Sequence, residues 1–134
     1  MEGSTALKFS GIHHIAIICS NYERSKDFYT RILGLTPIRE VFREERKSYK
    51  LDLALNGKYI IELFSFDSPP ERVSYPEAAG LRHLAFETEE IEENIKFLIS
   101  NGIEPEPIRI DPYTQNKCTF FADPDGLPIE LYEK

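Results

Sequence analysis

The stretches GIHHIAII, residues 11–18, and GLRHLAFE, residues 80–87, are similar enough to be two copies of one pattern. Each is predicted to be a β-strand with both faces buried, because apolar residues fall on both of its alternating faces. Each also contains a histidine at an equivalent place, His14 in the first and His83 in the second. The repeat therefore predicts two copies of one structural unit within the chain.

Each copy is followed, after almost the same interval, by an apolar segment that contains a glutamate. Glu62 in YIIELFSF lies 48 residues after His14, and Glu130 in LPIELYEK lies 47 residues after His83. An ionised carboxylate in an apolar strand is costly unless it is paired or binds a metal ion. Because this arrangement occurs twice at equivalent positions, the two histidines and two glutamates are the candidate site.

Two histidines and two carboxylates suit one divalent ion, Zn, Ni, Mn or Fe(II), with coordination positions left for water or substrate. A pseudo-twofold relation between the units would aim the four side chains at one axis. Taken singly, each histidine could be a hydrogen-bonded core residue, and each glutamate could pair with an arginine such as Arg82 or Arg109. The spaced quartet favours a metal site. His13 is expected to face away from His14, as alternate residues of a strand do.

The first unit is expected to contain a strand, a helix and three further strands. The helix at 22–33 would begin at a capping box, Ser20 to Glu23, and end at Gly34. Asn56-Gly57 predicts a two-residue hairpin turn. The expected strands occupy residues 12–18, 36–42, 48–55 and 58–66.

Alternation along the last of these strands predicts which side chains share a face. Ile60, Glu62 and Phe64 would lie on one face. The other face would carry Tyr59, Ile61 and Leu63.

The second unit repeats this order after a proline-rich linker at 67–80. Thr88 would cap a helix that ends before Gly102. The expected strands occupy residues 81–86, 103–110, 116–122 and 127–132. The fold class is therefore α+β, with one domain over 1–134 made of module one at 9–66 and module two at 81–134.

Composition narrows the function. A net charge of -7 and a pI near 5.0 argue against nucleic acid as a partner. The basic run at 39–50 is interleaved with acids, so it is either a solvated edge or a site for an anionic substrate. No signal peptide or membrane-length apolar run is evident, which favours a cytoplasmic protein, and Cys19 and Cys118 are expected to be buried, inert thiols.

The motifs HHIAI, SKDFYTRILGL, GLRHLAF and DPDGLPIELYE, together with the IELF strand, resemble those of the vicinal oxygen chelate superfamily, of which glyoxalase I is the best-known member. The resemblance spans residues 9–133. It implies paired βαβββ modules whose sheets curl around a metal ion. Carried over by position, the metal ligands would be His14, Glu62, His83 and Glu130.

The resemblance also implies a function. A second carboxylate resembles the glyoxalase pattern, in which a small α-oxo or hemithioacetal-type substrate passes through a metal-stabilised enediolate. Glu62 or Glu130 would act as the catalytic base. A homodimer is expected, and the site could form within one chain or across the dimer. The alternatives are an extradiol dioxygenase-like oxidoreductase and a binding or resistance protein without turnover.

Overall fold

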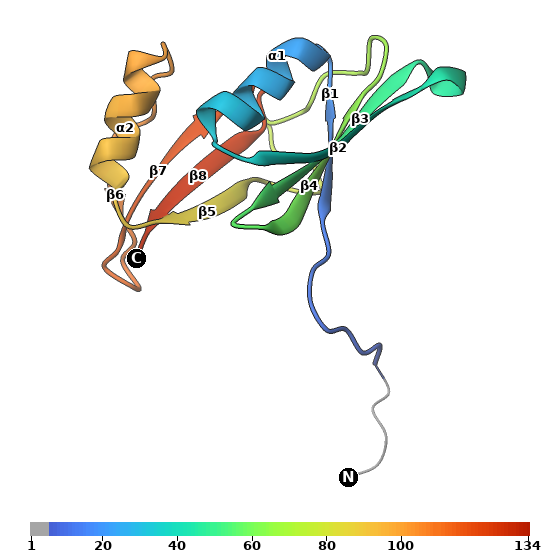
Figure 1. Ribbon diagram of the computed structural model, residues 1–134. Helices are drawn as coiled ribbons and strands as arrows, with labels where there is room; N and C mark the ends of the chain where they lie inside the picture. Colours follow the sequence, from blue (N-terminus) through green and yellow to red (C-terminus); the bar gives the residue numbers. More distant parts are fainter. Residues whose placement is uncertain (1–5) are drawn as a thin grey trace.

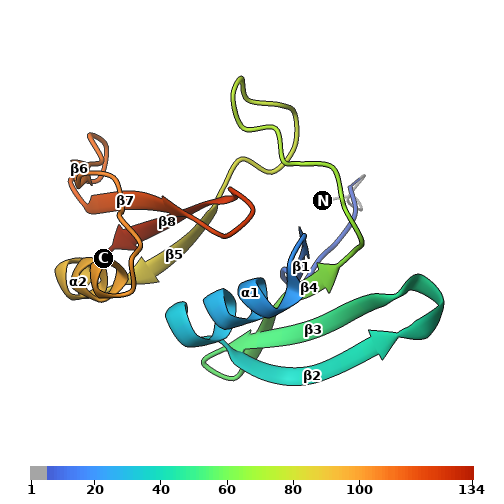
Figure 2. The ribbon, with the colours of Figure 1, turned by 90° about the horizontal axis from the view of Figure 1, so that it is seen from above.

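Two four-stranded sheets of the same topology form the molecule, and helix α1 lies between them (Figures 1 and 2). The structure is a computed structural model, and it describes residues 6–134. The first sheet has the order β1-β4-β3-β2 and the second the order β5-β8-β7-β6. The predicted α+β class with paired, equivalent sheets is confirmed.

The strands of the first sheet are β1 (Ile15–Cys19), β2 (Thr36–Arg43), β3 (Ser48–Leu55) and β4 (Lys58–Ser65). Those of the second are β5 (Leu84–Thr88), β6 (Arg109–Ile110), β7 (Lys117–Ala122) and β8 (Pro128–Glu133). The helical segments are α1 (Tyr22–Asp27), the π-helix η1 (Phe28–Ile32), the 3₁₀ turn η2 (Glu44–Arg46) and α2 (Ile91–Ser100).

The register of the inner strands repeats between the sheets. β1 runs parallel to β4 and sets Ala16 opposite Glu62, while β5 runs parallel to β8 and sets Ala85 opposite Glu130. Each glutamate therefore lies opposite the residue two positions after a histidine. This is the structural counterpart of the sequence repeat.

The core lies between the helical segments and the inner faces of the sheets. Leu51 and Leu63 are fully buried on the first sheet, as is Ile129 on the second. Burial of each such side chain contributes roughly 1.5–3 kcal/mol. The rings of Phe28 and Phe121 lie 6.2 Å apart and join the two halves into one core.

The predicted helix at 22–33 is present, but its second half is a π-helix. The predicted capping box is wrong. Asn21 caps the helix by accepting from the Arg24 amide at 3.1 Å. Ser20 instead donates to Asp125 of the second half, so its hydroxyl is not free to cap.

Three further expectations about element ends need correction. The first strand of each unit starts later than expected, at Ile15 and at Leu84, so both candidate histidines precede their strands. The strand expected at 103–110 is reduced to two residues, because the prolines before it cannot donate ladder hydrogen bonds. Thr88 lies two residues before the cap of α2 and accepts from the Glu90 amide.

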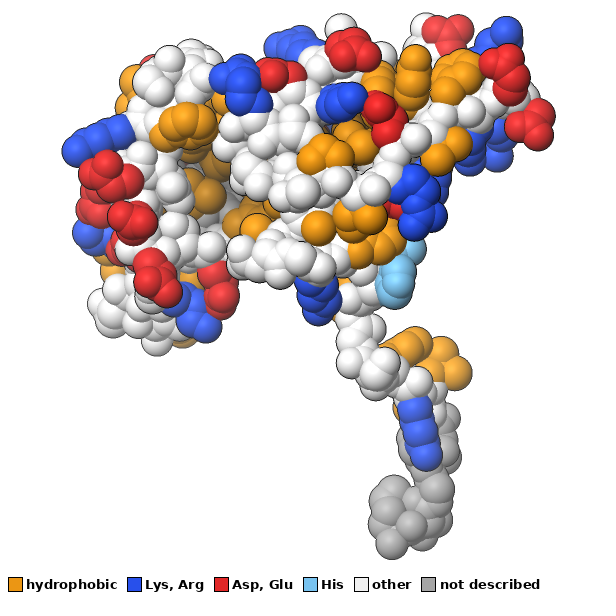
Figure 3. Space-filling view, in the orientation of Figure 1, with side chains coloured by type: hydrophobic (Ala, Val, Ile, Leu, Met, Phe, Trp, Pro, Cys, Tyr) orange, Lys and Arg blue, Asp and Glu red, His pale blue; other side chains and the backbone are white. Residues whose placement is uncertain are grey.

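The Asn56-Gly57 turn is confirmed, since both residues have positive φ, at 52° and 81°. Cys19 and Cys118 are free and buried, as expected. Acidic side chains gather over α2 (Figure 3). Over residues 6–134, no helix combines the length and apolarity needed to cross a bilayer.

Candidate functional site

The first sheet brings His14 and Glu62 together. Nε2 of His14 lies 3.4 Å from Oε1 of Glu62, whose side chain is 14% exposed. The ring of Tyr59 stacks on that of His14, with centroids 5.0 Å apart and planes within 8°. The imidazole of His14 therefore packs on the ring of Tyr59, with Nε2 near the carboxylate of Glu62.

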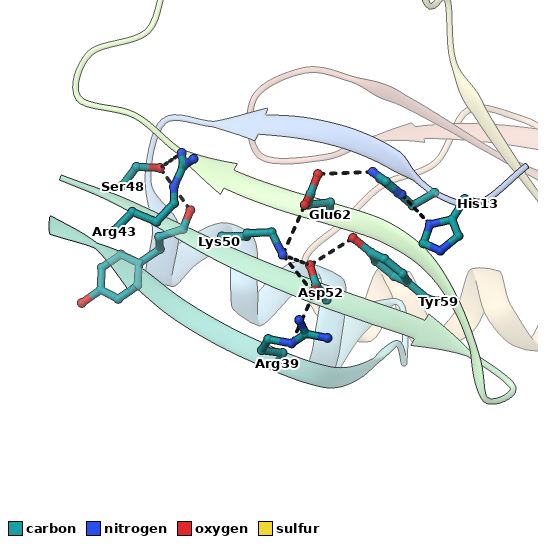
Figure 4. Close-up of polar contacts among 10 residues, drawn as sticks. His13, Arg39, Arg43, Ser48, Lys50, Asp52, Tyr59 and Glu62 are labelled. Carbon is teal, nitrogen blue, oxygen red and sulfur yellow. Dashed lines mark hydrogen bonds and ion pairs between the residues drawn. The ribbon is translucent and has the colours of Figure 1, made fainter. Parts of the chain in front are cut away.

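His13 does not face away from His14, so that prediction is wrong. The two Nδ1 atoms lie 2.8 Å apart (Figure 4). The strand begins only at Ile15, so the alternation of strand side chains does not extend to the two residues before it. When Nδ1 of His14 donates to Nδ1 of His13, Nε2 of His14 keeps the lone pair that binds a metal ion.

The second sheet holds the equivalent pair. Nε2 of His83 lies 3.1 Å from Oε1 of Glu130, which is 13% exposed. The ring of Phe120 meets the His83 ring edge to face, with centroids 5.1 Å apart. A cavity beside His83 is also lined by Arg82 and Arg109. Neither arginine forms an ion pair with Glu130 among the described ion pairs, and Arg109 pairs with Glu106 instead.

Both pairs have the spacing of neighbouring metal ligands. Two donors that each bind an ion at about 2.0–2.2 Å, at tetrahedral or octahedral angles, lie about 2.8–3.6 Å apart. The nitrogen–oxygen separations of 3.4 Å and 3.1 Å fall within that interval. Imidazole and carboxylate also suit divalent first-row ions. The residues present therefore fit such an ion.

The pairs do not meet within one chain. Over residues 6–134, no group of three or more His, Cys, Asp or Glu side chains is close enough to hold one ion. The structure thus contains two candidate half-sites, His14 with Glu62 and His83 with Glu130. The convergence of all four residues within a single chain is not observed.

Lys50, Asp52 and Tyr59 extend the first half-site and were missed by the sequence reasoning. Nζ of Lys50 lies 2.8 Å from Asp52 and 3.2 Å from Oε2 of Glu62 (Figure 4). The Tyr59 hydroxyl donates to Asp52 over 3.0 Å. The hydrogen bond to Asp52 raises the pKa of Lys50, so the ammonium stays charged beside both carboxylates.

Asp52 is only 2% exposed, so its charge depends on these donors. Burial alone would raise the pKa of Asp52, but the hydrogen bonds from Lys50 and Tyr59 outweigh it and lower the pKa overall. The sequence contains a pattern that predicts this cluster. In SYKLDLAL the polar Ser48, Lys50 and Asp52 alternate with the buried leucines and must share the opposite face.

Tyr59 could not be placed by alternation. The pairing of β3 with β4 shifts by one residue between Leu53 and Ala54, which sets Ala54 opposite Tyr59. An irregularity of this kind moves the next side chain to the other face. Tyr59 therefore lies with His14 and Asp52 rather than with the buried Ile61 and Leu63.

Comparison with known proteins finds a matching family and close relatives of this chain. The family described as the Glyoxalase/Bleomycin resistance protein/Dioxygenase superfamily matches residues 11–131. The uncharacterized protein YwkD of Bacillus subtilis is 63% identical over 92% of this chain and 96% of its own. The uncharacterized protein YaeR of Escherichia coli is 60% identical over 92% of this chain and 95% of its own.

Solved structures agree with this match. A glyoxalase family protein from Enterococcus faecalis is 54% identical, with a TM-score of 0.86 over 93% of this chain and 98% of that one.

Proposed function

The chain belongs to the Glyoxalase/Bleomycin resistance protein/Dioxygenase superfamily, and from this premise we propose that it is a metal-dependent lyase or isomerase of the glyoxalase type. Its substrate would be a small α-oxo or hemithioacetal-type compound. The observation that carries the proposal is the repeated His–Glu pair at ligand spacing, one pair on each sheet. Two carboxylates favour this reading over a dioxygenase, whose expected ligand set has two histidines and one carboxylate.

A divalent ion held by His14, Glu62, His83 and Glu130 would polarise a substrate carbonyl and favour loss of a proton from the neighbouring carbon. A structural neighbour was solved with a divalent metal ion. A mutant of the fosfomycin resistance protein FosX of Listeria monocytogenes, 23% identical with a TM-score of 0.72, was solved with Mn(II) and 1S,2S-dihydroxypropylphosphonic acid. At that identity the likeness shows the fold, and the metal is a proposal for this chain.

The two glutamates differ in how firmly they are held. Glu62 is tied by the Lys50 ammonium at 3.2 Å, so moving its carboxylate breaks an ion pair. Glu130 has no Lys or Arg partner among the ion pairs of residues 6–134. We therefore assign Glu130 as the base that moves the proton between adjacent carbons, with Glu62 as a fixed ligand.

Because the half-sites are separate within one chain, the complete site would form across a homodimer. A twofold axis would set His14 and Glu62 of one protomer against the partner's His83 and Glu130, and would create two equivalent sites. Exposed apolar side chains suit burial against a second copy. They include Ile18 on β1 and Ile38 and Phe42 on β2.

Metal content and turnover of the purified protein test the proposal. We expect about one ion per chain, loss of that ion in His83→Ala, and metal-dependent turnover of methylglyoxal with glutathione or of another α-oxo substrate. Glu23→Gln, an exposed change on α1, should keep both properties. Absence of metal after incubation with Zn, Ni, Mn or Fe(II) would refute the proposal, and oxygen uptake with a catechol would favour the dioxygenase reading.

Mixing two defective proteins tests the shared site. In a heterodimer of His14→Ala with His83→Ala, one site carries both changes and the other carries neither. Random exchange of subunits should therefore restore about a quarter of the sites. If the two proteins exchange subunits, as followed by mass labelling, and no metal binding returns, the site does not lie across the dimer.

A further inference from the structure

Arg43, at the end of β2, places a positive charge on the same face of the first sheet as Glu62. Arg43 lies opposite Ser48 in the β2–β3 register. Ser48, Lys50 and Asp52 then alternate along one face of β3, and Asp52 lies opposite Glu62 in β4. Arg43 therefore belongs to the face that carries the first half-site (Figure 4).

The guanidinium of Arg43 is underused as a donor. It offers five N–H groups, and its hydrogen bond within the described chain is from Nη2 to the Ser48 hydroxyl at 3.0 Å. Nε is buried and has no acceptor among residues 6–134. No carboxylate of the described residues forms an ion pair with Arg43, whereas Arg39 and Lys50 on the same face both pair with Asp52. A buried donor without an acceptor is destabilising, so an acceptor supplied by a ligand would stabilise this group.

Aromatic rings fix where this charge lies. The guanidinium carbon of Arg43 is 4.7 Å from the centre of the Phe64 ring and 5.9 Å from that of Phe66. Arg46 lies over the other ring, 5.7 Å from the centre of Phe66. Phe64 follows Glu62 by two residues on one face of β4, which is a spacing of roughly 7 Å along a strand. The cation thus lies about one small molecule's length from the half-site.

We infer that Arg43, together with Arg46, binds the anionic end of the substrate. The inference rests on the proposed function and narrows its substrate class. The substrate would be a small 2-hydroxy or 2-oxo compound whose adjacent oxygens lie at the His14 and Glu62 half-site and whose far end is a carboxylate or a phosphate. A guanidinium suits either group, because its planar fork can donate two parallel hydrogen bonds to two oxygens.

This assignment decides between the two readings of the basic run at 39–50. A solvated edge would leave Arg43 exposed or paired with one of the neighbouring acids. Instead it is half-buried, packs on Phe64 and turns toward the polar face. The chain's net charge of -7 repels anions generally, so a preference for an anionic probe would have to come from a local site.

Three probes test the inference by isothermal titration calorimetry of the Zn-treated protein. 2-Hydroxyglutarate has a carboxylate at its far end, 3-phosphoglycerate has a phosphate there, and 2-hydroxyvalerate has a methyl group. We expect at least one anionic probe to bind about ten- to a hundred-fold more tightly than 2-hydroxyvalerate, as a charge-assisted hydrogen bond provides. Whichever anionic probe binds more tightly identifies the terminal group.

Substitutions assign the preference to Arg43. Arg43→Gln should reduce the ratio of the affinity for the preferred anionic probe to that for 2-hydroxyvalerate to about one. Arg43→Lys keeps the charge but loses the two parallel donors of the guanidinium, so it should give an intermediate ratio. Arg24→Gln, at an exposed arginine of α1, should leave the ratio unchanged. In a ¹H–¹⁵N spectrum, the Nε signal that disappears in Arg43→Gln should shift with the preferred probe and not with 2-hydroxyvalerate.

Equal affinities of the unsubstituted protein for all three probes, including binding of none, would overturn the inference. A preference that persists in folded Arg43→Gln would do the same. Metal content is measured separately on each protein. If metal content and turnover are normal but Arg43 has no role in binding, this inference alone is refuted. If the protein binds no metal but its preference for an anionic probe depends on Arg43, the proposed function is refuted and the anion site remains.

Discussion

The Tyr29 hydroxyl donates to Oδ2 of Asp123 over 2.6 Å and so ties the helical segment of the first half to the last hairpin turn of the second. Both residues are buried, at 0% and 5% exposure. Asp123 also accepts from the amides of Asp125 and Leu127 at 2.9 Å each. One buried carboxylate therefore orders the turn and joins the two halves of the molecule.

Tyr29→Phe should lower the free energy of unfolding by about 1–3 kcal/mol, because it leaves a buried carboxylate oxygen without its donor. Urea denaturation measures this change. Tyr113→Phe removes a hydroxyl from a side chain that is 94% exposed and should have an effect within about 0.5 kcal/mol. Equal stabilities of the two variants would show that the link between the halves contributes little.

His13→Ala should weaken metal binding about ten-fold or more, because His13 orients the ring of His14 through its Nδ1 contact. His13→Asn should lose less affinity, since its side-chain oxygen can accept the same hydrogen bond. Competition with a chelating dye gives the affinities. A loss in His13→Asn as large as in His14→Ala would make His13 a ligand itself, and no loss in His13→Ala would remove its positioning role.

Glu130→Gln should reduce turnover by about 100-fold or more, since an amide cannot take up the transferred proton. Glu62→Gln should also reduce turnover, but mainly together with metal affinity, because its carboxylate is assigned as a fixed ligand. Steady-state rates measured alongside metal content separate the two effects. Near-normal activity of both variants would refute the catalytic scheme.

Burial raises the pKa of the Cys19 thiol from 9.0 to about 11. The folded protein therefore keeps this proton at a pH where the unfolded chain releases it. The raised pKa contributes to the free energy of unfolding. This contribution is fully present below pH 9 and is lost as the pH rises toward 11, so the free energy of unfolding falls by about 1 kcal/mol by pH 10.

Urea denaturation at pH 8 and pH 10 should show this fall, and Cys19→Ala should show a smaller one. The native thiol should also resist alkylation at pH 8, where it is almost wholly protonated. Rapid alkylation of Cys19 in the folded protein would contradict the raised pKa.

The sequence repeat predicted most of the fold. Two histidines and two glutamates at nearly equal spacing predicted two equivalent units, and the register of Glu62 opposite Ala16 and Glu130 opposite Ala85 shows why. Apolar periodicity and turn chemistry are local properties, so the helices, the Asn56-Gly57 hairpin and most strands were predictable from the sequence.

The sequence by itself determined the four candidate site residues and their grouping into one histidine and one glutamate per unit, because a histidine before one strand and a glutamate in its parallel neighbour are joined by sheet register. Only the tertiary structure decided that the two pairs lie apart within one chain. It also decided that Tyr59 turns toward His14, and that Nε of Arg43 is buried without an acceptor among residues 6–134. These features depend on a register irregularity and on packing between strands distant in sequence, which no local pattern encodes.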